Sequence, residues 1–162
     1  MQIKIQRLLP EQWELFRQVR LHALGDSPDA FCSTLEKEEA YLEKDWKARL
    51  ANENCRTFLA LIGDSKPAGL VAGAPYDSQA GLFGMWVDSD ERQKGIGSSL
   101  IDAVADWAKH SGYSQLLLDV ADDNLSAISL YRSKGFIKTG VTGTVPFPRQ
   151  HISEHQLCLR LT

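Results

Sequence analysis

The sequence has few cysteines and no long apolar run. Its 162 residues include three cysteines, Cys32, Cys55 and Cys158, and no CxxC pair. An odd, scattered set of this kind predicts reduced thiols and not a disulfide framework. No apolar run approaches the roughly 20 residues needed to cross a bilayer, and residues 1–10 lack the apolar core of a signal peptide. We therefore expect a cytoplasmic protein that has no membrane partner.

An excess of positive charge is also lacking. Lys and Arg number 18 against 21 Asp and Glu, which gives a net charge of −3 and a pI of about 5.8. A sequence-independent nucleic-acid binder needs a basic surface, so this class is not expected. The length, with 43% hydrophobic and 24% charged residues, predicts one globular domain over residues 1–162.

Hydrophobic periodicity predicts a mixed sheet flanked by about four helices. Apolar alternation and short apolar runs predict strands at 2–9, 56–62, 69–74, 82–87, 115–120, 136–141 and 154–161. Apolar residues at helical spacing predict helices at 10–25, 35–50, 98–110 and 125–134. The βαβ order around helix 98–110 makes its two flanking strands parallel, whereas the hairpins before it are antiparallel. The expected fold class is α+β, with about seven strands in one α/β mixed sheet.

The stretch from Leu82 to Leu100 carries the clearest chemical signal. Strand 82–87 leads into a polar turn, and the segment 92–97 (RQKGIG) then opens a helix. The first amides of a helix have no intrahelical partner, and the helix dipole adds positive potential there. Glycines let the backbone approach an anion closely, and Arg92 and Lys94 add charge. The turn therefore predicts a phosphate or pyrophosphate site.

Two common phosphate motifs do not fit this turn. The P-loop needs GxxxxGK followed by Ser or Thr, and no lysine follows Gly97. The Rossmann fingerprint needs GxGxxG directly after a strand, but Leu100 replaces the third glycine and the polar residues 88–94 separate the strand from Gly95. A Rossmann-type nucleotide binder stays a minor alternative, because Asp119 follows the glycines at a sequence spacing that suits a ribose contact.

A third motif, R/Q-x-x-G-x-G/A, matches residues 92–97, and a second segment supports it. The pattern N-x-x-A-x-x-[LF]-Y-x-x-x-G-F is matched by Asn124, Ala127, Leu130, Tyr131, Gly135 and Phe136. With both motifs on the right elements, the chain resembles the GNAT superfamily of N-acetyltransferases over its whole length. The resemblance implies a single N-acetyltransferase domain with the GNAT acyl-CoA N-acyltransferase fold. In that fold the parallel strands, here 82–87 and 115–120, splay apart in a mostly antiparallel sheet.

The resemblance also implies acetyl-CoA as co-substrate and no metal. The implied cofactor contacts are Trp86, Val87, Arg92, Gln93, Lys94, Gly95, Ile96, Gly97, Ser98, Ser99, Asn124, Ala127 and Tyr131. The pyrophosphate would lie on the amides of residues 93–98, and the pantetheine would pair with strand 82–87. The Val87 amide would then stabilise the oxyanion of the thioester, and Tyr131 would protonate the departing thiolate as general acid.

The general base and the acceptor are less well defined. Candidates for the base are Glu36, Asp88, Asp119 and Glu154, and Glu154 is the first choice. The acceptor would be a primary amine of a small molecule or peptide, bound between the first two helices and the loops 25–35 and 142–153. Acidic residues in 26–45 suggest either a cationic acceptor or a solvated face.

Several alternatives stay open. The same fold could serve as a non-catalytic acyl-CoA-binding regulatory module. Cys32 could carry an acyl group, and His151, His155 and Cys158 could be offered as a metal site, although direct attack without a metal is preferred. A homodimer is kept as an option for the assembly.

Overall fold

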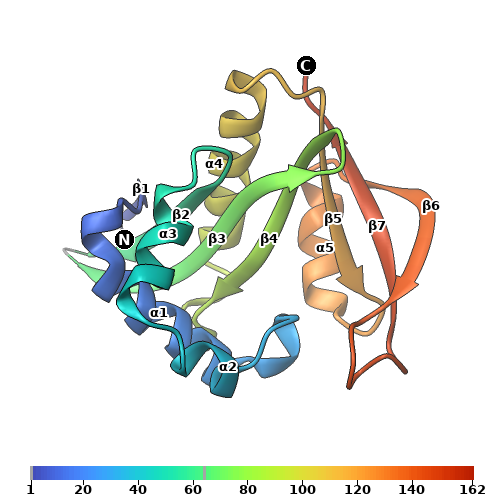
Figure 1. Ribbon diagram of the computed structural model, residues 1–162. Helices are drawn as coiled ribbons and strands as arrows, with labels where there is room; N and C mark the ends of the chain where they lie inside the picture. The colour runs from blue at the N-terminus through green and yellow to red at the C-terminus, as the bar shows by residue number, and fades with distance from the viewer. Residues whose placement is uncertain (1, 64) are drawn as a thin grey trace.

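The computed structural model describes residues 2–63 and 65–162, and these residues form one seven-stranded sheet (Figure 1). The strand order is β1-β2-β3-β4-β5-β7-β6. The strands are β1 (Ile3–Arg7), β2 (Arg56–Ile62), β3 (Lys66–Tyr76), β4 (Gln79–Val87), β5 (Gln115–Ala121), β6 (Ile137–Thr144) and β7 (Ser153–Arg160). Neighbouring strands are antiparallel except for the parallel pair β4–β5. The predicted mixed sheet is confirmed, and it lacks the run of parallel strands of a Rossmann core.

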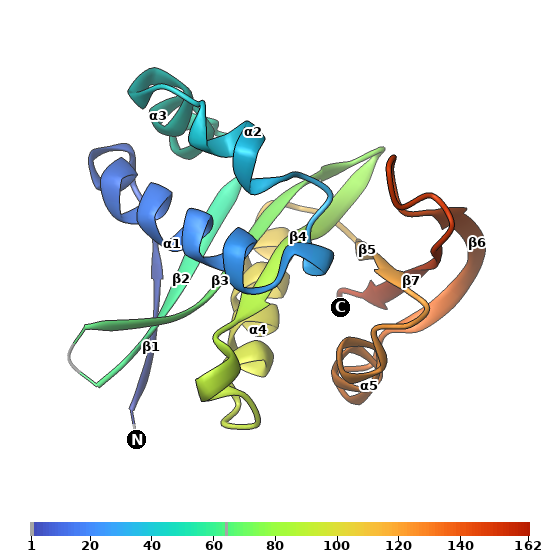
Figure 2. The ribbon, with the colours of Figure 1, turned by 90° about the horizontal axis from the view of Figure 1, so that it is seen from below.

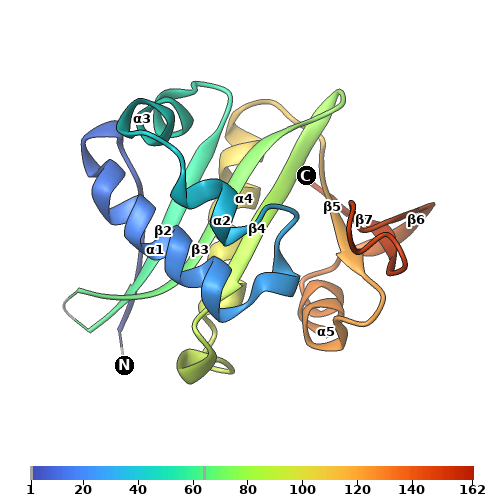
Figure 3. The same ribbon diagram turned by 60° about the horizontal axis from the view of Figure 1, so that its bottom comes forward.

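Helices cover both faces of the sheet. They are α1 (Trp13–Asp26), α2 (Leu35–Glu39), α3 (Glu43–Ala51), α4 (Ile96–His110) and α5 (Leu125–Ser133), with short 3-10 turns η1 (Pro10–Gln12), η2 (Pro28–Ala30) and η3 (Ser89–Glu91). Figures 2 and 3 show α1, α2 and α3 on one face and α4 and α5 on the other. No helix within residues 2–63 and 65–162 has the length and apolar character to cross a membrane.

The prediction of one helix over 35–50 was wrong, because this segment forms two helices. Thr34 caps α2, and its hydroxyl oxygen accepts a hydrogen bond from the Lys37 amide at 3.2 Å. The chain then leaves the helix after Glu39, and the Asp45 carboxylate accepts from the Leu42 amide at 2.8 Å to start α3. After the break Glu38 and Trp46 lie on separate helices, and both side chains are buried.

The core lies in two apolar clusters, one on each face of the sheet. On one face α4 buries Leu100, Ile101 and Val104 completely against the strands. On the other face Phe16 of α1 and Trp46 of α3 meet in an edge-on contact with ring centroids 5.4 Å apart. Burying a leucine or phenylalanine side chain contributes about 1.5–3 kcal/mol, so these clusters hold the helices on the sheet.

Strands β4 and β5 pair only at their starts. The register joins Ala80 to Leu116 and Gly81 to Leu117 and goes no further. On its other side β4 carries a bulge, since its register with β3 shifts between Phe83 and Trp86. Gly84 lies in this bulge with φ +60°, a conformation that favours glycine. The bulge bends β4 away from β5, so the two strands splay apart (Figure 1).

The hairpin between β3 and β4 is tighter than predicted. We expected strands at 69–74 and 82–87 with a turn at 75–79, but Pro75 pairs with Ala80 and Tyr76 pairs with Gln79. The turn is therefore limited to two residues, and Asp77 takes φ +53° there. Proline and glycine at the strand ends hid these extensions in the sequence pattern. The tight turn keeps Tyr76 beside β5.

Candidate active site

A cleft of about 640 Å³ opens where β4 and β5 splay apart. Its walls include residues 82–85 of β4 and residues 118–121 of β5. Asn124, Ala127 and Tyr131 line it from the α5 face, and residues of α1, η2 and the 145–154 region line it from the α1 face. The cleft therefore reaches both faces of the sheet, so that two molecules can approach one point from opposite sides.

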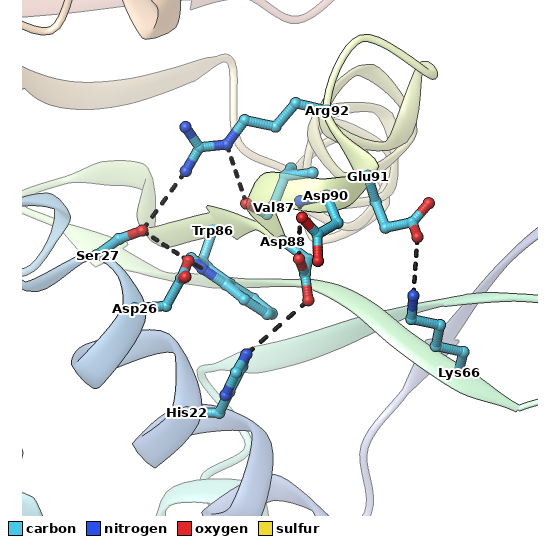
Figure 4. A network of polar contacts seen from close by, with 10 residues as sticks. All are labelled: His22, Asp26, Ser27, Lys66, Trp86, Val87, Asp88, Asp90, Glu91 and Arg92. Atoms are coloured by element: carbon cyan, nitrogen blue, oxygen red, sulfur yellow. Dashed lines mark hydrogen bonds and ion pairs between the residues drawn. The ribbon is translucent and has the colours of Figure 1, made fainter.

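The end of β4 offers backbone groups to this gap. The Asp88 amide donates to the Ala68 carbonyl at 2.8 Å, and Val87 pairs with Gly69 in the register. Hydrogen-bonding direction alternates along an antiparallel strand, so the Val87 amide and carbonyl point away from β3, toward the gap. The Val87 carbonyl accepts from Arg92 Nε at 3.2 Å (Figure 4). An extended ligand can thus pair with the Val87 amide as a further strand would.

Trp86 points the other way. It is 3% exposed and its indole Nε1 donates to Asp26 Oδ2 at 3.1 Å (Figure 4). Its ring also meets that of His22 edge-on at 5.5 Å. The side chain packs β4 against α1 and does not line the cleft. The Trp86 side chain therefore helps to hold β4 against α1.

The glycine-rich turn presents backbone N–H groups at the start of α4. Gln93 and Gly95 have φ +62° and +87°, and Gly95 is the N-cap. The Ser99 amide donates to the Gly95 carbonyl at 3.1 Å, while the amides of 96–98 have no backbone acceptor outside the helix among the described residues. A turn of this geometry gathers N–H groups around an anion at the positive end of the helix dipole.

Charged side chains around this turn are already paired. Lys94 and Lys66 both bind the Glu91 carboxylate, at 2.7 and 2.9 Å. Arg92 spans from the Val87 carbonyl to Ser27 Oγ at 3.5 Å and so ties the turn to the end of α1 (Figure 4). Because Arg92 and Lys94 already have partners, the donors of this turn that are left for a ligand are the backbone amides.

Lys134, which sequence reasoning did not single out, lies beside the first turn of α4. Its Nζ donates to Ser98 Oγ at 2.9 Å and pairs with Asp102 at 2.7 Å. A Cβ at Gly97 would lie 2.8 Å from a Leu130 methyl group, so glycine lets α5 come this close. Lys134 directly precedes the Gly135-Phe136 part of the second motif, and this position in the sequence could have marked it as a candidate site residue.

Tyr131 lies in the cleft with its side chain almost fully enclosed. It is 5% exposed, and its ring packs against Phe136 with centroids 5.6 Å apart. Burial raises the pKa of its hydroxyl above the ordinary value, so Tyr131 carries its proton at neutral pH. Asn124 caps α5, since its Oδ1 accepts from the Ala127 amide at 3.3 Å. Both motif residues therefore meet at the α5 side of the gap.

Two of the four candidate bases line the cleft, Asp119 and Glu154, whereas Glu36 and Asp88 do not. Asp119 accepts from Tyr76 Oη at 3.0 Å. Burial raises the pKa of Glu154, and the negative charges of Asp119 and Asp122 raise it further. Glu154 is therefore a more basic carboxylate than an ordinary glutamate, as a proton acceptor near neutral pH requires.

The alternatives for Cys32 and the histidines gain little from the structure. Loss of water around Cys32 raises the pKa of its thiol, which disfavours the nucleophilic thiolate. His155 Nδ1 contacts Asp122 Oδ1. Across residues 2–63 and 65–162 no three His, Cys, Asp or Glu side chains come together as a metal site, so His151, His155 and Cys158 do not form one.

The splayed parallel pair and the glycine-rich helix start define the N-acyltransferase class of fold. The family model described as "Acetyltransferase (GNAT) family" matches residues 12–136, and the chain belongs to this family. The resemblance seen in the sequence motifs is thus confirmed.

Individual relatives agree with this assignment. Homo sapiens N-acetyltransferase 8 is 36% identical over 95 residues, covering 55% of this chain and 42% of the relative. The ribosomal protein bS18-alanine N-acetyltransferase of Salmonella typhimurium is 29% identical over 128 residues, covering 79% and 74%. A crystal structure of the ribosomal-protein-S18-alanine N-acetyltransferase from Escherichia coli shares the fold, with a TM-score of 0.73 at 21% identity over 99% and 95% of the chains. The chain spans less than half the length of the first curated relatives it matches.

Proposed function

We propose that this protein transfers an acetyl group from acetyl-CoA to a primary amine of a small molecule or peptide. The observation that carries the proposal is the cleft at the splayed β4–β5 pair, which reaches both faces of the sheet and holds Tyr131. GNAT acetyltransferases use acetyl-CoA, so the family assignment supports the donor. Two faces allow donor and amine to meet in a ternary complex, where the amine attacks directly.

The donor would lie along features that the backbone provides. Its pyrophosphate fits the amides of residues 93–98 at the start of α4, and Lys134 adds a nearby positive charge. Its pantetheine arm fits the open edge of β4, where it pairs with Val87. Asn124 and Ala127 line the same path on α5. The residues present therefore fit an acyl-CoA, and the proposal needs no metal.

Each chemical step then has a candidate group. The amine nitrogen forms a bond to the acetyl carbon while the Val87 amide stabilises the developing oxyanion. Glu154 accepts the proton lost by the amine, directly or through water. The bond from carbon to sulfur breaks, and Tyr131 donates its proton to the departing thiolate. Proton exchange with water returns both residues to their starting states.

Measurement of free CoA with a thiol reagent tests the proposal. Acetyl-CoA is offered with a panel of primary amines that includes small amines and peptides with a free N-terminus. We expect CoA release that depends on the amine. If acetyl-CoA protects the protein from thermal unfolding and no amine gives turnover, the chain is instead a non-catalytic acyl-CoA-binding module.

Fewer observations bear on the cellular location and the assembly of the protein. Cys32, Cys55 and Cys158 are all unpaired, which suits a reducing compartment such as the cytoplasm. We keep the cytoplasm as the proposed location and a homodimer as one proposed assembly.

Glu154→Gln is expected to lower kcat about 10–100-fold at neutral pH, because glutamine cannot accept the proton. In the unaltered protein, kcat/KM should fall as the pH decreases through the raised pKa of Glu154, since only the carboxylate accepts a proton. The variant should lose this acidic limb in a pH–rate profile. Glu36→Gln, on the exposed side of α2, is the matched control. An unchanged profile in Glu154→Gln would rule out Glu154 as the base.

A further inference from the structure

One end of the cleft carries positive charge that the proposed chemistry does not use. Arg20 of α1 and Arg49 of α3 both line the cleft, and both bind the carboxylate of Glu38. Arg20 Nε and Nη2 donate to it at 2.9 and 3.0 Å, and Arg49 Nη1 donates at 3.0 Å. Glu38 is 2% exposed. Two guanidinium groups thus share one carboxylate, and one positive charge is left over.

The remaining nitrogen of Arg20 lies against the β4 bulge that lines the cleft. A Cβ placed on Gly84 would lie 2.9 Å from Arg20 Nη1, and Gly84 forms the bulge of β4 that lines the cleft. The Arg20 side chain is only 13% exposed, and among the described residues Nη1 has no hydrogen-bond acceptor. Arg20 also stacks over the Phe31 ring at 4.6 Å, which fixes its direction. A guanidinium group held in this way keeps an Nη1 donor that an acceptor atom of a ligand can bind in place of water.

Negative charge lines the same cleft, because Asp119 and Glu154 are among its lining residues. Burial has the largest effect in raising the pKa of the Cys32 thiol, Glu154 and Asp119 raise it further, and Arg149 and Arg20 lower it. Groups of both signs therefore act on the Cys32 thiol, which lines the cleft. Arg149 is less available than Arg20, because it binds the backbone carbonyls of Asp29 and Phe31 and the Asp29 carboxylate.

Apolar residues line the cleft together with these charged groups. Phe31, Phe83 and Val145 line the cleft, and Phe83 is 40% exposed. A molecule bound in this cleft is therefore offered a carboxylate base, apolar rings and a guanidinium group within one set of lining residues. The cleft is thus polarised for a ligand that carries both an amine and an anion.

We propose that Arg20, positioned by Glu38 and Arg49, binds a carboxylate of the acceptor, so that the acceptor class is an amine that also bears a carboxylate. The amine then lies toward Glu154 and the carboxylate toward Arg20 Nη1, with the apolar part of the acceptor on Phe31 and Phe83. The inference rests on the proposed acetyl transfer and specifies its acceptor.

Matched pairs of amines test this acceptor class. The pairs are phenylalanine and phenethylamine, 4-aminobutyrate and butylamine, and 6-aminohexanoate and hexylamine, which place the carboxylate at different distances. We expect kcat/KM to be about tenfold or more higher for the carboxylate member of at least one pair. Arg20→Lys, which keeps the charge beside Glu38 but shortens the donor, should lower that ratio about tenfold, mainly through KM.

Arg17→Lys, the same substitution one turn earlier on α1 and outside the cleft, should leave the ratio unchanged. If Arg20 only supports the fold, Arg20→Lys slows both members equally and the ratio stays constant, which overturns the proposal. Calorimetric titration of the same pairs into the CoA-loaded unaltered protein measures the preference without turnover. A carboxylate preference there without catalysis refutes only the acetyl transfer, whereas no preference in any pair refutes the anion site.

Discussion

Replacing Tyr131 by phenylalanine is expected to lower kcat about 100-fold or more while acetyl-CoA still binds. The substitution removes the hydroxyl that protonates the thiolate but keeps the ring that packs on Phe136. Because burial raises the pKa of Tyr131, its ionisation should not limit activity anywhere near neutral pH. Steady-state CoA release gives kcat, and protection from thermal unfolding by acetyl-CoA shows that binding persists.

Tyr113→Phe is the matched control for this experiment. Tyr113 packs against Trp107 with ring centroids 5.9 Å apart and does not line the cleft. It should therefore keep its kcat within a factor of about two, as is usual for substitutions away from a site. If Tyr131→Phe also kept full kcat, the thiolate would have to be protonated by water or by another group.

Glu38→Gln is expected to lower the free energy of unfolding by about 3–5 kcal/mol. Removal of one charge from a buried ion-paired set leaves its partners uncompensated, and here Arg20 and Arg49 would face each other. Urea denaturation followed by tryptophan fluorescence measures the change. Glu39→Gln, next along α2 and exposed, should change the stability by less than about 0.5 kcal/mol. A similar small change for Glu38→Gln would mean that solvent already screens the two arginines.

The same carboxylate makes the stability depend on acid. Burial by itself would raise the pKa of Glu38, but the hydrogen bonds and charge of Arg20, helped by Arg49, lower it from 4.5 to about 2. A carboxyl group with a lowered pKa contributes stability that is full above its unfolded pKa and is lost as the pH falls through the folded value. The unaltered protein should thus lose stability between pH 4.5 and about 2 more steeply than Glu38→Gln does.

The backbone shape of the glycine-rich turn was predictable because its parts are adjacent in the sequence. Gly95 and Gly97 fix a local backbone shape, and the helix that follows supplies the dipole whatever packs around it. The segment from Asn124 to Phe136 is likewise a local unit of cap, helix and stop. Short motifs of this kind set out their backbone donors without help from distant residues.

The charged end of the cleft was not predictable in this way. Arg20 and Glu38 are 18 residues apart, and Glu38 and Arg49 are 11 apart, so their contact depends on how α1, α2 and α3 pack together. In the sequence Glu38 was one of many acidic residues in 26–45, which suggested either a cationic acceptor or a solvated face. Its carboxylate is instead enclosed with Arg20 and Arg49, which are distant from it in the sequence. Lys134 and Ser98 likewise meet only through the contact between α4 and α5.

The short pairing between β4 and β5 has a consequence for the end of each turnover. Strands β1–β4 and β5–β7 are joined in register only at Ala80 and Gly81 of β4, and Gln79 Oε1 accepts a hydrogen bond from the Gln115 amide at 3.1 Å beside them. In the proposed reaction the donor lies in the gap as a temporary strand and ties both parts of the sheet together. Its departure as free CoA would leave β4 and β5 paired only at Ala80 and Gly81 again, so that each turnover ends by releasing a strand of the sheet as well as a product.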